Sequence, residues 1–137
     1  MKLTLYTHHA ARVLVHLAAA SERLSSMSEI ARTYGMSHNH LTKVVHDLRM
    51  AGFVEAVRGR GGGIRLARPA REITLGDVVR HTESGRTRPR DTAAEDAFLH
   101  EIFEAAFGSF FSELDGNSLF DLADAERARS ADTRSVH

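Results

Sequence analysis

The chain has 137 residues, no cysteine, and equal numbers of acidic and basic side chains, 18 of each. The absence of cysteine excludes disulfides, thiolate zinc sites, thiol redox switches and cysteine-ligated iron–sulfur clusters. No apolar run approaches the ~20 residues that a membrane-spanning helix needs, so we expect a cytoplasmic globular protein without a membrane partner.

Three helices are predicted in the first fifty residues. Apolar residues at spacings of three and four predict the first helix over residues 7–21. Ser26 begins an S-x-x-E capping-box pattern that opens a second helix ending at Tyr34, and Gly35 suits the left-handed position that follows. Ser37 can cap a third helix directly afterwards. Two helices joined by a short turn that contains glycine are typical of a helix-turn-helix.

The third helix is amphipathic and is followed by a basic β-hairpin. Its apolar stripe has the spacing i, i+3, i+4, i+7 and consists of Leu41, Val44, Val45 and Leu48. Gly52 closes this helix. Residues 53–58 and 63–67 alternate apolar and polar side chains, which predicts two strands, and the turn over residues 59–63 is nearly all glycine. This order of elements predicts a winged helix-turn-helix, and the expected partner is double-stranded DNA.

The charges are segregated along the chain. Residues 32–71 contain eight Lys or Arg and two carboxylates, whereas residues 91–126 contain ten carboxylates and neither Lys nor Arg. A solvated charge gradient without function would give the same pattern. Together with the hairpin, however, the segregation favours a basic face that binds a polyanion.

Most of the DNA affinity should come from phosphate contacts by Arg and Lys, and the specificity from contacts to base edges. Asn39, His40 and Lys43 are the recognition candidates, because they lie opposite the apolar stripe near the start of the third helix. Arginines around the glycine turn are expected to reach phosphates or the minor groove. The complete set of predicted DNA contacts is Ser37, His38, Asn39, His40, Thr42, Lys43, Arg58, Arg60, Gly61 and Arg65.

The C-terminal half is predicted to contain a short helix over residues 73–82, a polar loop, and a long helix over residues 95–114. Six of the seven phenylalanines lie between residues 98 and 120, which is more apolar surface than one small domain covers. The same helix of a second copy would cover it in a symmetric homodimer, and the alternative is packing against the protein's own first helix. The predicted dimer contacts are Phe103, Phe107, Phe110 and Leu114.

The predicted fold class is therefore mainly α with a small β-hairpin wing (α+β). A winged helix-turn-helix domain should cover residues 1–83, a loop residues 84–94, and dimerisation helices residues 95–126. The polar residues 127–137 are expected to form a disordered tail.

Several motifs together resemble a known family. They are MKLTLYT at the start, YGMSHNHLTKVVHDLRMAGFVEAVRG in the middle, GGIRLARPAREITLGDVVRHTE after the wing, and a weaker FFSELDGNSLFDL at residues 110–122. The chain resembles the Rrf-two superfamily of bacterial winged-helix regulators, and within it the NsrR-like repressors more than the IscR-like proteins. The resemblance implies a homodimer on a palindromic promoter site, with the long C-terminal helix crossing its mate.

One departure from the family pattern is clear. Cluster-binding members have three cysteines between the GDVV helix and the long helix, at positions that correspond to Arg86, Asp91 and Ala97 or lie near them. None is cysteine here. We therefore interpret the chain as a cluster-free branch, to which nitric-oxide or cluster sensing does not carry over.

Histidines leave a different sensing mechanism open. His8 lies where the resemblance implies a carboxylate ligand in NsrR-like proteins, and His100 lies where IscR-like proteins have a histidine ligand. These two, joined by His9, His81, Asp91 or Glu95, could ligate a metal ion or haem across a dimer. The alternatives are that they are ordinary surface histidines, and that the effector is a small molecule, a protein partner or pH.

An enzymatic role is not expected. The chain contains no nucleophile motif, and the GRGGG turn lacks the Lys-Ser/Thr of a phosphate-binding loop and does not precede a helix.

Overall fold

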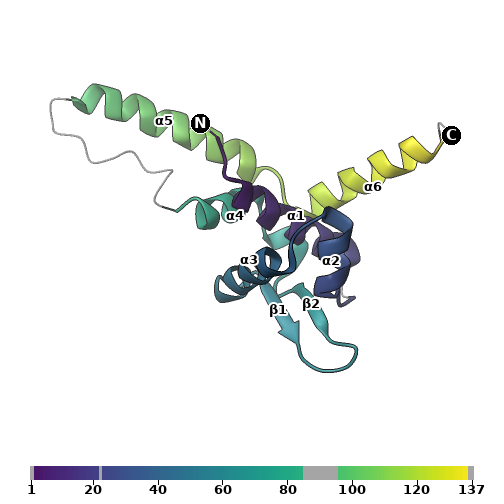
Figure 1. The fold of residues 1–137 in the computed structure, drawn as a ribbon. Helices are drawn as coiled ribbons and strands as arrows, with labels where there is room; N and C mark the ends of the chain where they lie inside the picture. Colours follow the sequence, from purple (N-terminus) through teal and green to yellow (C-terminus); the bar gives the residue numbers. More distant parts are fainter. Residues whose placement is uncertain (1, 22, 85–95, 136–137) are drawn as a thin grey trace.

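The computed structural model describes residues 2–21, 23–84 and 96–135. In chain order its elements are α1 (Leu5–Ala20), α2 (Met27–Tyr34), α3 (His38–Met50), β1 (Val54–Val57), β2 (Gly63–Leu66), the 3-10 helix η1 (Ala70–Glu72), α4 (Leu75–Thr82), α5 (Ala97–Asp115) and α6 (Leu119–Ser135). The predicted class, mainly helical with one antiparallel hairpin, is confirmed (Figure 1).

The helix-turn-helix is set by the capping residues that the sequence indicated. The Ser26 hydroxyl accepts a hydrogen bond from the Glu29 backbone N–H at 3.1 Å and begins α2. Gly35 ends α2 in the left-handed conformation, with φ of 65°. The Ser37 hydroxyl accepts from the His40 N–H at 3.2 Å, so α3 begins shortly after α2 ends.

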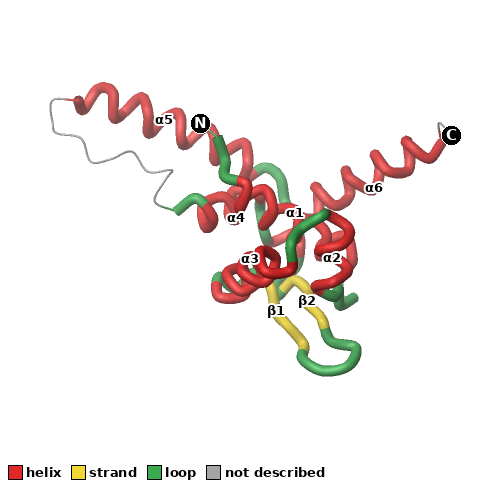
Figure 2. Tube along the Cα trace, viewed as in Figure 1, coloured by secondary structure: helices red, strands yellow, loops and turns green. Residues whose placement is uncertain are grey.

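The wing is an antiparallel hairpin of β1 and β2 (Figure 2). Glu55 is opposite Arg65 in its register. The segment between α1 and α2 adds a third piece of strand. Ser25 and Ile64 exchange two backbone hydrogen bonds, at 2.9 and 2.8 Å. Gly63 permits this approach, because a Cβ there would lie 2.6 Å from the Ser25 carbonyl oxygen. The hairpin is thus anchored to the helical body through β2, close to the turn.

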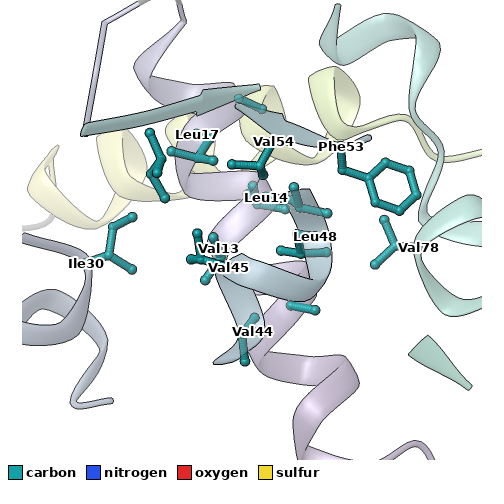
Figure 3. Close-up of a cluster of buried hydrophobic side chains, with 14 of the residues drawn as sticks. Val13, Leu14, Leu17, Ile30, Val44, Val45, Leu48, Phe53, Val54 and Val78 are labelled. Atoms are coloured by element: carbon teal, nitrogen blue, oxygen red, sulfur yellow. The ribbon is translucent and has the colours of Figure 1, made fainter. Parts of the chain in front are cut away.

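The hydrophobic core is built around α1, which packs against α3, α4, α6 and β2. Leu14 and Leu17 are completely buried there. The predicted stripe of α3 faces them and is also buried, with Phe53, Val54 and Val78 closing the cluster (Figure 3). Burial of one such side chain contributes roughly 1.5–3 kcal/mol to stability, so this packing fixes α3 on the body.

The junction of α4, α5 and α6 is held by local and backbone hydrogen bonds. Thr74 and Asp77 form a reciprocal capping box at the start of α4. The N–H of Leu75 donates to the carbonyl of Asn117, and that of Leu119 donates to Ile73, both at 2.8 Å. From this junction α5 and α6 project away from the body in different directions (Figure 1).

One prediction differs from the structure, and one alternative that the sequence left open does not hold. Helix α6 continues to Ser135, whereas we expected a disordered tail from residue 127. Residues 123–131 contain four alanines together with Glu and Arg, which all favour a helix even when it is exposed. The prediction of a disordered tail rests on the polarity of these residues alone. Helix α5 packs against α4, while α1 packs against α6, so α1 does not cover the phenylalanines of α5.

In the described parts of the chain, no helix combines the length and the apolar character that a membrane crossing requires.

Candidate nucleic-acid interface

The start of α3 presents a polar and largely exposed face. The side chains of Ser37, His38, Asn39, Thr42 and Lys43 are all exposed. The Thr42 hydroxyl donates to the His38 carbonyl oxygen at 2.8 Å, whereas no side-chain hydrogen bond is found for Asn39 or Lys43 within the described residues. An amide and an ammonium group in this position have the hydrogen-bonding capacity to contact base edges in a major groove.

His40 lies in the same turn of α3 but is already engaged. Its Nε2 lies 2.6 Å from the Nδ1 of His9 on α1, and the two rings meet edge to face. Burial, and then the charges of His40 and His8, lower the pKa of His9. One ring nitrogen therefore donates to the other, and His9 holds His40 in place. His40 is less available to a base than its position in the sequence suggested.

A second polar cluster fixes the middle of α3. The Tyr6 hydroxyl of α1 donates to Asp47 Oδ2, and His81 Nε2 of α4 lies 2.9 Å from the same oxygen. The ring of His81 also packs edge to face on Phe53. Burial, and the Asp47 carboxylate, raise the pKa of Tyr6 well above its usual range, so the hydroxyl remains a donor at neutral pH. Asp47 thus connects α3 to two other helices.

The tip of the wing carries Arg58 and Arg60, which are exposed and have no carboxylate partner in the described parts of the chain. Gly59 and Gly61 adopt φ of 100° and 74°, which glycine tolerates and other residues rarely adopt. Arg65, further down the hairpin, donates from Nε to Glu55 at 2.5 Å. Of the three predicted wing arginines, Arg65 is paired, and the other two have no carboxylate partner among residues 2–21, 23–84 and 96–135.

The other end of the molecule carries the apolar stripe of α5. Phe98, Leu99, Ile102 and Phe103 are exposed, while Phe107, Phe110 and Leu114 are partly buried toward α4. Arg80 of α4 donates to both oxygens of Asp115, at 2.7 and 2.6 Å, and stacks over Phe111. This pairing, which lowers the pKa of Asp115, fastens the C-terminal end of α5 and leaves its N-terminal half exposed.

The two histidines considered as metal ligands do not meet within one chain. His8 is exposed on α1, and His100 is partly buried on α5. The described residues contain no group of three or more His, Cys, Asp or Glu side chains that could hold a metal ion. Asp91, Glu95 and the cluster position at Arg86 lie outside the described residues.

Sequence reasoning missed both polar clusters that hold α3. His9 and His40 are 31 residues apart, and Asp47 is 41 residues from Tyr6 and 34 from His81. The one available signal was a carboxylate at residue 47 within a basic segment, on a helix expected to face DNA. Such an acidic residue is more useful as an internal acceptor than next to phosphates.

Comparison with known proteins identifies the family. A family model for Rrf2, described as an iron-dependent transcriptional regulator, matches residues 3–125. The chain belongs to the Rrf2 family. It is therefore a DNA-binding transcriptional regulator with a winged helix-turn-helix, and not an enzyme.

The chain is also similar to individual proteins over most of its length. Protein aau3 of Rhizobium meliloti (strain 1021) is 42% identical over 133 residues, which cover 91% of this chain and 86% of that protein. IscR of T. potens superimposes with a TM-score of 0.77 at 32% identity, covering 93% of this chain and 90% of that one. CymR, the global cysteine regulator of B. subtilis, superimposes with a TM-score of 0.73 at 29% identity, covering 91% and 98%.

The Rrf2 description names iron, and the residues present do not fit a cysteine-ligated site. The sequence contains no cysteine, and the described part of one chain offers no alternative set of three ligands. The likeness to NsrR-like members in particular stays a prediction.

Proposed function

We propose that the protein acts as a homodimeric repressor on a palindromic promoter site in the cytoplasm, without a cysteine-ligated iron–sulfur cluster. Each copy would place the first turn of α3 in the major groove of one half-site. Asn39 and Lys43 would read base edges, and Arg58 and Arg60 would contact phosphates or an adjacent narrow minor groove. The observation that carries this proposal is the combination of an exposed polar start of α3 with unpaired arginines at the wing tip.

The rigid support of α3 favours this function. Base-specific contacts require side chains on a helix whose position is fixed, and α3 is fixed by its buried stripe and by the hydrogen bonds of His40 and Asp47. Gly61 permits a close approach of the wing backbone to DNA, because it carries no side chain. Within the predicted set, Ser37 caps α3, Arg65 is paired with Glu55, and both would act by positioning their neighbours.

Dimerisation is supported by the exposed apolar stripe of α5. A second copy related by a two-fold axis would present the same stripe and remove both from water. The two recognition helices would then address two half-sites related by the same axis, which is why we propose a palindrome.

The proposal is tested by DNA binding over a range of salt concentrations. Every phosphate that the protein neutralises on B-DNA contributes about 0.9 to the slope of log K against log salt. Arg60→Ala should therefore reduce the slope by about 2 in a dimer with two wings. Fluorescence anisotropy with the promoter duplex of the protein's own gene measures this. Arg134→Ala, which removes an exposed arginine at the far end of α6, is the matched control and should change neither affinity nor slope.

Asn39→Ala should give a contrasting result in the same assay, namely a relaxed preference at one base position in each half-site. An Arg60→Ala protein with unchanged affinity and unchanged salt slope would show that the wing does not contact DNA.

A further inference from the structure

A groove lined by arginines lies on the side of the molecule formed by β2, η1, the end of α1 and α6. Its volume is about 690 Å³, within the range of sites for small organic ligands. We name it the arginine groove, and its defining residues are Arg65, Arg68, Arg71, Arg127, Glu55 and Phe120. Helix α3 contributes none of the lining residues, so this groove is separate from the exposed start of α3, although it shares Arg65 with the wing.

The charge of the arginine groove is not balanced within the described parts of the chain. Arg65 is paired with Glu55, which is the one carboxylate among the described residues of the lining. Arg68 donates from Nη2 to the Glu72 carbonyl at 3.1 Å, and Arg127 from Nη2 to the Ala19 carbonyl at 3.0 Å. These bonds to neutral carbonyls orient the guanidinium groups and leave their charges unpaired.

Arg71 also lines the arginine groove, together with Phe120. Its guanidinium carbon lies 3.7 Å from the centroid of the Phe120 ring, so the guanidinium plane is held against an aromatic face. A stacked guanidinium keeps its N–H groups directed outward at the edge of the ring, available to an acceptor. Pro69 and Ala70 add apolar surface beside it.

These features define the kind of ligand that the arginine groove fits. Guanidinium groups bind carboxylate and phosphate groups through paired hydrogen bonds. The aromatic and aliphatic walls would cover an apolar body attached to such a group. We propose that the arginine groove binds a small organic anion, a carboxylate or phosphate carried on an apolar body, and that this anion is the effector of the regulator.

The location of the groove gives binding a route to DNA. Arg65 belongs to β2 of the wing, and the Arg65–Glu55 pair links the two strands of the hairpin. An anion in the groove would compete with Glu55 for Arg65 and so favour a different position of the wing. A ligand shifts an equilibrium only as far as its affinities for the two states differ, and this exchange of partners provides such a difference. The effector role rests on the proposed function, whereas binding itself does not.

Binding is tested first without DNA. The probes are 4-fluorobenzoate and 4-fluorophenyl phosphate, titrated with the full chain and followed by fluorine NMR. We expect saturable binding of at least one probe, weakened tenfold or more by Arg71→Gln and by Arg127→Gln, and unchanged by the control Arg134→Gln. The preferred probe tells whether the anion is a carboxylate or a phosphate. Arg71→Lys keeps the positive charge but loses the planar guanidinium group. It should also weaken probe binding, which would show that the geometry of the guanidinium matters in addition to its charge.

A second arm measures promoter DNA affinity by anisotropy, with and without a saturating concentration of the bound probe. We expect the probe to change the affinity at least threefold for the unsubstituted protein and not for Arg71→Gln. Absence of binding by both probes, or binding that the groove variants leave unchanged, would overturn the proposal. The proposal would also be overturned if Arg71→Gln lowered the DNA affinity and the salt slope while neither probe bound to the protein, because the groove would then hold DNA phosphates. If the probe binds as expected but Arg60→Ala leaves DNA binding intact, the assignment of the wing as a DNA contact is refuted, and the proposed anion site is not.

Discussion

The exposed stripe of α5 allows a quantitative prediction for Phe103→Ala. The Phe103 side chain is 54% exposed in the single chain, and a phenylalanine has about 200 Å² to bury, so a partner can cover roughly 110 Å². At about 25 cal/mol per Å² this amounts to about 2.7 kcal/mol in each copy. A symmetric dimer contains two copies of the contact, which gives about 5 kcal/mol in total.

Each 1.4 kcal/mol is roughly a tenfold change in an equilibrium constant, so complete coverage predicts a dimer Kd raised about 10⁴-fold by Phe103→Ala. Coverage of half that area predicts about 10²-fold. Sedimentation equilibrium over a range of protein concentrations measures the dimer Kd directly. Because Phe103→Ala weakens dimerisation, it should lower the affinity for a palindromic duplex. The affinity for a single half-site should stay the same.

Met50→Ala is the matched control, because Met50 is even more exposed, at 76%, and lies at the end of α3 rather than on α5. It should leave the dimer Kd unchanged. If Phe103→Ala changed the Kd less than threefold, the stripe would not be the dimer interface, and the reasoning from exposed apolar area would be refuted.

Three further predictions concern stability. Gly63→Ala should lower the free energy of unfolding by about 1–3 kcal/mol in urea titrations, because its Cβ would collide with the Ser25 backbone and open the strand pairing. Gly108→Ala, in an open part of α5, should raise it by about 0.5–1 kcal/mol. Burial lowers the pKa of His16, so the unfolded chain binds a proton there more readily and stability falls as pH drops below about 6.5. His16→Gln should therefore show a smaller decrease of Tm between pH 7.5 and 5.5 than the unsubstituted protein.

Each of these predictions has an outcome that contradicts it. Equal effects of Gly63→Ala and Gly108→Ala would mean that the close approach to Ser25 is not needed. A His16→Gln protein whose Tm follows the same pH dependence as the unsubstituted protein would assign acid destabilisation to other groups.

The sequence predicted those parts of the fold that depend on local interactions. The caps at Ser26 and Ser37, the left-handed Gly35 and the buried stripe of α3 each involve residues close to one another in the chain. The same holds for the hairpin and its basic turn. These patterns were sufficient to predict the winged helix-turn-helix and to choose DNA as the partner.

What the sequence did not reveal depends on residues brought together from distant elements. No periodicity connects Tyr6 to Asp47, or Arg71 to Phe120 and Arg127. These groupings exist only once α1 has packed on α3, and η1 on α6. The arginines after the wing were treated as part of one basic segment, whereas Arg68 and Arg71 line a groove that also includes Arg127 of α6. The partner-dependent parts of the proposal, the dimer and the palindrome, depend on contacts outside a single chain.

The shared carboxylate of Asp47 has a consequence for how this protein could change its preferred operator during evolution. A recognition helix that is held only by an apolar stripe can rotate about its axis, because apolar side chains repack at a low cost in free energy. Here Tyr6 and His81 approach one oxygen from two helices, so a roll of α3 would break both hydrogen bonds together. The orientation of the exposed face of α3 is therefore coupled to α1 and α4, and the three helices would keep their arrangement together during evolution. New operators would be reached by exchanging the side chains at the start of α3, with its angle in the groove retained.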